Sequence, residues 1–122
     1  MNSTIILDVA RKTRKWALMN RGYFPKTLLG MCAVASHKLS TSLKQHGISS
    51  RLAVTDNHVW VEVGDICVDV TATQFGKEPI IIMNRKNYMS ELNITQAPVR
   101  FRNPDIMKFH LAKSGWCFSQ IP

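Results

Sequence analysis

Hydrophobic and polar residues alternate along residues 58–71, and the alternation is interrupted only at Gly64 and Asp65. A period of two is typical of half-buried β-strands, and glycine tolerates the positive φ that a two-residue hairpin turn needs. With Gly64 and Asp65 as the turn, apolar residues face one another in pairs: Val63 with Ile66, Val61 with Val68, and Val59 with Val70. The pattern therefore predicts a β-hairpin with one apolar core face.

The opposite face of this hairpin carries the residues that bear chemistry: His58, Trp60, Glu62, Cys67, Asp69 and Thr71. On that face His58 and Asp69 are diagonal neighbours, within reach of a hydrogen bond between imidazole and carboxylate. A histidine that a carboxylate orients is the usual partner of a catalytic nucleophile. The pair raises the question of which nucleophile this histidine would serve.

Two helices are expected before the hairpin, at about Thr4–Asn20 and Met31–His46, and Gly47 ends the second. The second helix has a stripe of small and apolar residues spaced by three or four: Cys32, Ala35, Ser36, Leu39 and Leu43. Cys32 is then in the first turn, where the helix dipole lowers the pKa of a thiol and backbone N–H groups can receive an oxyanion. A small core residue is the alternative interpretation of Cys32.

The remainder of the chain predicts short strands and one more helix. Strands are expected at 51–55, 79–83 and 99–101, and a helix at 103–113 with Asn103 as its cap and Pro104 at its first position. The polar stretch 84–96 predicts no element. Helices followed mostly by strands indicate an α+β fold. We expect a single domain over residues 1–122, with a helical part at about 4–46, a sheet-rich part at about 51–102 and a C-terminal helix and tail at 103–122.

Composition and sequence patterns indicate which cellular compartment, cofactors and partners to expect for this domain. Three cysteines without repeat spacing favour reduced thiols and a cytoplasmic location. No signal-peptide pattern begins the chain, and no apolar run is long enough for a membrane span. We expect no cofactor and no metal, because the four histidines have no recognisable ligand spacing. The formal net charge of +8 predicts attraction to acidic surfaces.

Three residues can supply the roles that thiol catalysis needs. Cys32 would attack a carbonyl, His58 would hold and return the proton, and Asp69 would fix the imidazole tautomer. The N–H of Cys32 would be one oxyanion donor. The second donor is open among Asn20, Tyr23 and Gln74, and Trp60 is interpreted as packing or as a substrate contact.

Four segments carry a resemblance to known enzymes: residues 30–36 with their continuation through Leu39, Leu43, Gly47 and Ile48 to Val54, the strand 58–63, the run 69–71, and Gln74-Phe75. Together they resemble the core of transglutaminase-like and papain-like cysteine enzymes over residues 28–76. Those families place the nucleophile at the start of a helix and the histidine and the acid on following strands. The last segment is similar to papain-fold glutamine deamidase toxins.

The resemblance implies a papain-like core, with Cys32, His58 and Asp69 as the matching triad and a protein amide as the substrate. Hydrolysis would make the enzyme a deamidase or peptidase, and transfer to an amine would make it a transglutaminase. Lys26 stands where a papain-like oxyanion glutamine is expected, and the chain is short for a two-walled cleft. Both departures favour a side-chain or terminal amide over an extended peptide. The resemblance also implies a compact effector, delivered to the cytoplasm of a host or target cell.

Two other functions compete with the enzyme hypothesis. The same fold can be a catalytically inactive binding module whose basic surface holds an acidic protein or nucleic acid. Nucleic acid could be bound through residues 11–15 and 100–113, although a solvated helix face is the favoured interpretation of the first run, because few aromatic residues interleave its charges. An acidic surface on a protein substrate is the partner that the enzyme hypothesis predicts.

Overall fold

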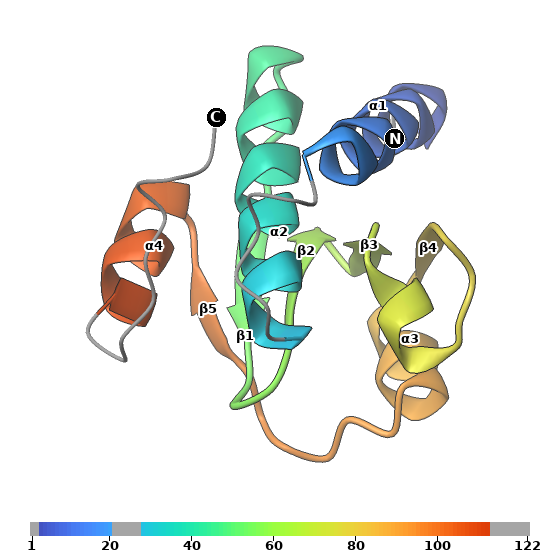
Figure 1. Cartoon of the computed structure of the whole chain (residues 1–122), viewed down its shortest axis with the longest axis vertical. Coiled ribbons are helices and arrows are strands. Elements are labelled where there is room, and N and C mark those ends of the chain that lie inside the picture. The colour runs from blue at the N-terminus through green and yellow to red at the C-terminus, as the bar shows by residue number, and fades with distance from the viewer. Residues whose placement is uncertain (1–2, 21–27, 113–122) are drawn as a thin grey trace.

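The structure is a computed structural model that describes residues 3–20 and 28–112. Within these residues the chain is α+β, with four helices and a five-stranded antiparallel sheet in the order β4-β3-β2-β1-β5 (Figure 1). The elements follow one another as α1 (Ser3–Met19), α2 (Leu28–Gln45), β1 (Arg51–Val54), β2 (Val59–Val63), β3 (Ile66–Asp69), the 3₁₀ turn η2 (Ala72–Phe75), β4 (Ile81–Asn84), α3 (Arg85–Glu91), β5 (Val99–Phe101) and α4 (Pro104–Ala112). The predicted α+β class is confirmed.

The hairpin has the register that its alternation predicts. Val61 pairs with Val68 and Val63 with Ile66, and Gly64 occupies the turn with a φ of 59°. The predicted edge strand at residues 99–101 is also present and pairs with β1. The C-terminal helix begins where Asn103 caps it, because Asn103 Oδ1 accepts hydrogen bonds from the backbone of Asp105 and Ile106.

Helix α2 covers the apolar face of the central strands (Figure 1). Its stripe residues Ala35, Leu39 and Leu43 form one buried cluster with the hairpin valines. Helix α1 packs on α2 and adds Ile6 and Val9 to the same cluster. Helix α4 lies beside α2 and packs on β1 and β5 through Met107 and Leu111. Two cations of the basic run in α1 already have partners within the protein. Lys12 forms an exposed ion pair with Asp8, and Arg14 donates a hydrogen bond to the carbonyl of Val70.

The second face of the sheet is also buried, although alternation predicts only one core face. Every residue of β2 is buried, and Trp60 and Cys67 pack with Tyr88 of α3. Helix α3 lies in the polar stretch where no element was predicted. It begins at a capped terminus, with Asn84 Oδ1 accepting a hydrogen bond from the backbone of Asn87. The cover therefore comes from a helix of seven residues that has little apolar periodicity of its own.

Burial of this second face forces its polar residues into pairs, because an unpaired buried charge is costly. The Glu62 side chain is fully buried and accepts hydrogen bonds from Arg100 at 2.8 Å, Arg85 at 3.3 Å and Trp60 at 3.2 Å, with Arg51 at 3.5 Å. Burial opposes ionisation of Glu62, but the arginines outweigh it and hold the pKa of this carboxyl below its ordinary value. One carboxylate thus ties together β1, β2, β5 and α3.

The charge of Glu62 should make stability depend on pH. Because its pKa is depressed in the folded state, its contribution is present above the ordinary pKa of 4.5 and is lost as the pH falls through the folded value. We expect Glu62→Gln to lower the free energy of unfolding by about 2 kcal/mol at neutral pH, since the partly exposed arginines screen the loss. The difference from wild type should shrink on acidification. Urea denaturation at several pH values measures it.

The matched control for this substitution is Glu91→Gln, which removes a carboxylate that is half exposed beside Lys77. That change should cost less than about 0.5 kcal/mol at any pH. Equal effects of the two substitutions at neutral pH would contradict the structural role of Glu62.

Candidate active site

The predicted hydrogen bond between His58 and Asp69 is present. His58 immediately precedes β2 and Asp69 ends β3, so both lie at the same end of the hairpin, opposite its turn. His58 Nε2 is 2.8 Å from Asp69 Oδ2, and both side chains are almost completely buried. The pair that the register predicts therefore forms inside the protein, where its hydrogen bond is shielded from solvent.

Tyr88 of α3 is the functional candidate that sequence reasoning missed. Its hydroxyl donates to Asp69 Oδ2 at 2.7 Å and lies 3.0 Å from His58 Nε2. Burial and the charge of Asp69 raise the pKa of Tyr88, so the phenol keeps its proton and remains a donor. Asn84, the cap residue of α3, was the sequence signal that could have placed a helix around Tyr88.

Asp69 is held as a carboxylate by donors on both of its oxygens. Oδ1 accepts from the backbone N–H of Thr71 at 2.8 Å and from its hydroxyl at 3.2 Å, while Oδ2 accepts from His58 and Tyr88. Burial opposes ionisation, but the hydrogen bonds from His58, Thr71 and Tyr88 hold the pKa of Asp69 below its ordinary value. An ionised carboxylate can only accept hydrogen bonds, so each group bound to Asp69 must act as the donor.

This pattern assigns the proton of the neutral imidazole. Because Asp69 Oδ2 can only accept, we expect a neutral His58 imidazole to carry its hydrogen on Nε2 and to leave Nδ1 as the acceptor nitrogen. Nδ1 is buried and has no hydrogen-bond partner among the described residues. The ring is fixed in place by Trp60, stacked at 5.7 Å between centroids, and by Phe75, edge-on at 4.8 Å. The site therefore presents an oriented base.

Cys32 lies next to this histidine. Its Sγ accepts a hydrogen bond from the backbone N–H of Val59 at 3.2 Å, one residue beyond His58. Cys32, a residue of α2, also packs against Val59 of β2, and its side chain is fully buried. The structure thus places Cys32 near the end of the hairpin that carries His58 and Asp69, with its sulfur bound to the backbone one residue beyond His58.

The expected environment of Cys32 is wrong in two respects. Helix α2 begins at Leu28, three residues earlier than predicted, so Cys32 is its fifth residue. Its N–H then belongs to the regular hydrogen-bond ladder and is no longer one of the free donors of the first turn. Burial raises the pKa of the Cys32 thiol, and the hydrogen bond from Val59 offsets only part of this. The resting group is a neutral thiol rather than the thiolate that a helix terminus would favour.

The four other candidate contacts differ in what they can still bind. Asn20 donates its amide to the carbonyl of Trp16 and so caps its own helix, and Tyr23 lies outside the described residues. Trp60 donates to Glu62 and packs against His58. Gln74 is different: both polar atoms of its side chain are buried and have no hydrogen-bond partner among the described residues. Its amide is the candidate with donor capacity left for an oxyanion.

A pocket of about 410 Å³ adjoins the histidine. It is lined by residues 55–58, Phe75 and residues 92–96. Among the described residues that line it, Asp56 is the only carboxylate and no lysine or arginine is present, while the remaining polar groups are hydroxyls, amides and the His58 imidazole. A neutral amide therefore suits this pocket better than an acidic group does. Within residues 3–20 and 28–112, no group of three His, Cys, Asp or Glu side chains is placed to hold a metal ion.

In comparisons with known proteins, no family model, no curated protein and no solved structure matches this chain. In the described part of the chain, no helix is both long and apolar enough to cross a membrane.

The contribution of Tyr88 can be tested without touching the triad. Tyr88→Phe keeps the ring that packs against Trp60 and removes only the hydroxyl that donates to Asp69. We expect the free energy of unfolding to fall by about 1.5 kcal/mol, because a buried carboxylate loses one donor. Urea denaturation measures the change, and a stability equal to that of wild type would show that the hydroxyl is not bound to Asp69.

Proposed function

We propose that this protein is a thiol-dependent acyl-transfer enzyme that acts on a protein amide, with Cys32 as nucleophile, His58 as base and Asp69 as the orienting acid. The observation that carries the proposal is the buried imidazole of His58. Its Nε2 is bound to Asp69, its Nδ1 has no partner among the described residues, and the next backbone N–H binds the sulfur of Cys32. A papain-like or transglutaminase-like core is the architecture that we propose for this arrangement.

The chemistry begins with proton transfer from the Cys32 thiol to His58 Nδ1 as sulfur attacks the carbonyl carbon. The new C–S bond gives a tetrahedral oxyanion, for which the Gln74 amide is the proposed donor. Collapse breaks the C–N bond, and Nδ1–H protonates the departing ammonia or amine. Water then releases an acid from the thioester, or an amine takes the acyl group and leaves a new amide.

Burial of Cys32 has a direct consequence for this scheme. A neutral thiol with a raised pKa is a poor nucleophile until a base removes its proton. In this proposal the imidazole of His58 supplies that base at the moment of attack, and Asp69 keeps the imidazole in position. Because the Cys32 side chain is fully buried, substrate binding must expose Sγ before attack.

The pocket beside His58 supports a neutral substrate group. Its lining combines hydroxyl and amide groups with Leu92 and Ile94, which suits the methylenes and the amide of a glutamine or asparagine side chain. We therefore propose a side-chain amide as the first substrate class, with a terminal amide second.

The acylation step can be tested with p-nitrophenyl acetate, an activated ester that needs no protein substrate. We expect a burst of p-nitrophenolate and one acetyl group on Cys32, detected by intact mass and peptide mapping. Cys32→Ala should abolish both signals, and His58→Ala should slow the burst by about 100-fold or more. Near-ultraviolet circular dichroism of each variant verifies that the fold is retained.

Cys67→Ala is the matched control, because Cys67 is also fully buried and its pKa is raised to about 12 by burial. That variant should acylate as wild type does. Acetylation distributed equally over the cysteines, or a burst that survives Cys32→Ala, would refute the proposal. Release of ammonia from dimethylcasein, against incorporation of a fluorescent amine into it, then distinguishes hydrolysis from transfer.

A further inference from the structure

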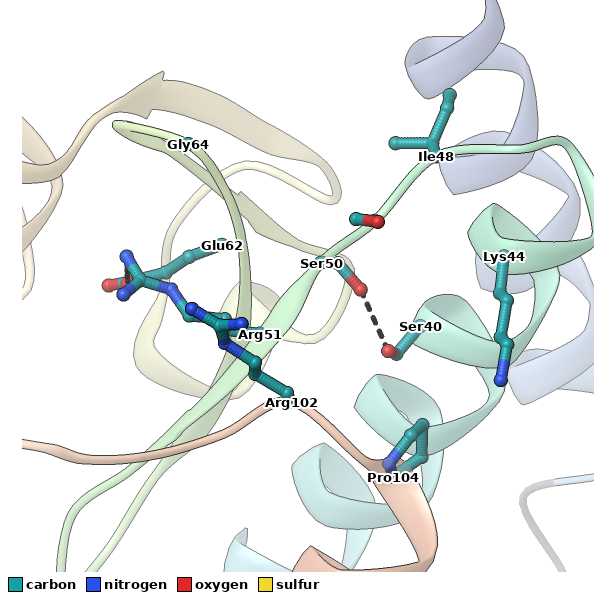
Figure 2. Close-up of a pocket in the computed structure, with 10 residues that line it drawn as sticks. Ser40, Lys44, Ile48, Ser50, Arg51, Glu62, Gly64, Arg102 and Pro104 are labelled. Carbon is teal, nitrogen blue, oxygen red and sulfur yellow. Dashed lines mark hydrogen bonds and ion pairs between the residues drawn. The ribbon is translucent and has the colours of Figure 1, made fainter.

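A second and larger pocket lies at the other end of β2 (Figure 2). Its volume is about 470 Å³, and its walls come from the end of α2, the start of β1 and the segment that enters α4. Glu62 lines it, and Glu62 is four positions after His58, which corresponds to about 13 Å along an extended strand. This pocket is therefore distinct from the candidate active site.

Two arginines form one wall of this pocket. Leu52 of β1 pairs with Phe101 of β5, and Arg51 and Arg102 are the next residues along the chain at that end of the pair. Figure 2 shows both side chains on the sheet side of the pocket. Like charges held near each other repel, and an anion bound beside them relieves that repulsion. Arg102 is exposed and has no hydrogen bond or ion pair within the described part of the chain.

Glu62, the one carboxylate among the described residues that line the pocket, does not neutralise this wall. Glu62 already binds Arg100 and Arg85 and lies 3.5 Å from Arg51, so a single negative charge is shared by three guanidinium groups. Arg85 has a second, more distant partner in Asp65 at 3.8 Å. The pocket therefore keeps an excess of positive charge to which Arg102 adds.

The opposite wall carries a third cation. Lys44 is exposed near the end of α2, and Figure 2 shows it across the pocket from the arginines, with the hydroxyls of Ser40 and Ser50 between. These hydroxyls are 2.7 Å apart. Lys44 contributes to lowering the pKa of Asp105, but the hydrogen-bond partner of Asp105 is His37, at 3.0 Å. Lys44 thus has its donors available.

From these contacts we infer that the pocket binds an acidic peptide segment, with one carboxylate on the Arg51–Arg102 wall and another on Lys44. The planar guanidinium group of arginine can bind a carboxylate through two parallel hydrogen bonds. Because the arginines and Lys44 lie on opposite walls, they suit two separate carboxylates better than one phosphate group. The apolar surface of Ile48 and Pro104 provides contact for the methylenes that carry the carboxylates. Binding does not use Cys32 and goes beyond the proposed acyl transfer.

Fluorescence anisotropy with labelled hexaglutamate tests the inference directly. We expect saturable binding to wild type and to Cys32→Ala alike, and none of labelled hexaglutamine. Lys44→Ala and Arg102→Ala should each weaken hexaglutamate binding about fivefold, because each removes one carboxylate partner. Both residues are exposed, so thermal melts should be unchanged.

Arg11→Ala is the matched control, since it removes one exposed positive charge from α1. It should weaken binding less than about twofold. Equal weakening by Arg11→Ala and Arg102→Ala would show diffuse attraction to a basic protein and would overturn the inference. Displacement of the peptide by inorganic phosphate at an equal concentration would overturn it in favour of a phosphate site. Absence of binding at low salt would also refute it.

Discussion

Burial of the sheet on both faces is the constraint on which the rest of this structure depends. Helix α2 covers the apolar face of the hairpin, and α3 covers the face that carries His58, Glu62 and Asp69. Polar groups buried in this way are stable only when they are hydrogen-bonded or paired. The second face therefore contains two polar clusters, one at each end of β2, and each is built around a hydrogen-bonded carboxylate, Glu62 or Asp69. A solvent-facing sheet would need neither.

The two clusters differ in what they leave unsatisfied. At Glu62, three arginines share one carboxylate, and positive charge remains at the surface of the larger pocket. At Asp69, donors fill both oxygens, and the residual capacity is a single basic nitrogen, Nδ1 of His58. In our proposals the excess positive charge around the first cluster attracts an acidic segment, and His58 of the second cluster takes a proton from Cys32. We thus propose that one physical requirement, the pairing of buried charge, produces both sites.

The hairpin register and the His58–Asp69 bond could be predicted from the sequence because side chains in a strand alternate with a strict period of two. The Asn103 cap was predictable for a similar reason, since it depends on local chemistry alone. Tyr88 was missed because α3 is short and polar and is stabilised mainly by its packing on the sheet. The expected acidity of Cys32 was wrong because it depends on where α2 begins and on how deeply the thiol is buried. Neither is a property of local sequence.

The tautomer of His58 is the most direct test of the proposed role of this site. It can be read by nuclear magnetic resonance of isotope-labelled histidine at mildly alkaline pH, in wild type and in Asp69→Asn. We predict a proton on Nε2 and an unprotonated Nδ1 in wild type, with loss of this preference when Asp69 no longer requires a donor. A proton on Nδ1 in the wild-type protein would contradict the proposal, because His58 would then have no basic nitrogen to offer Cys32.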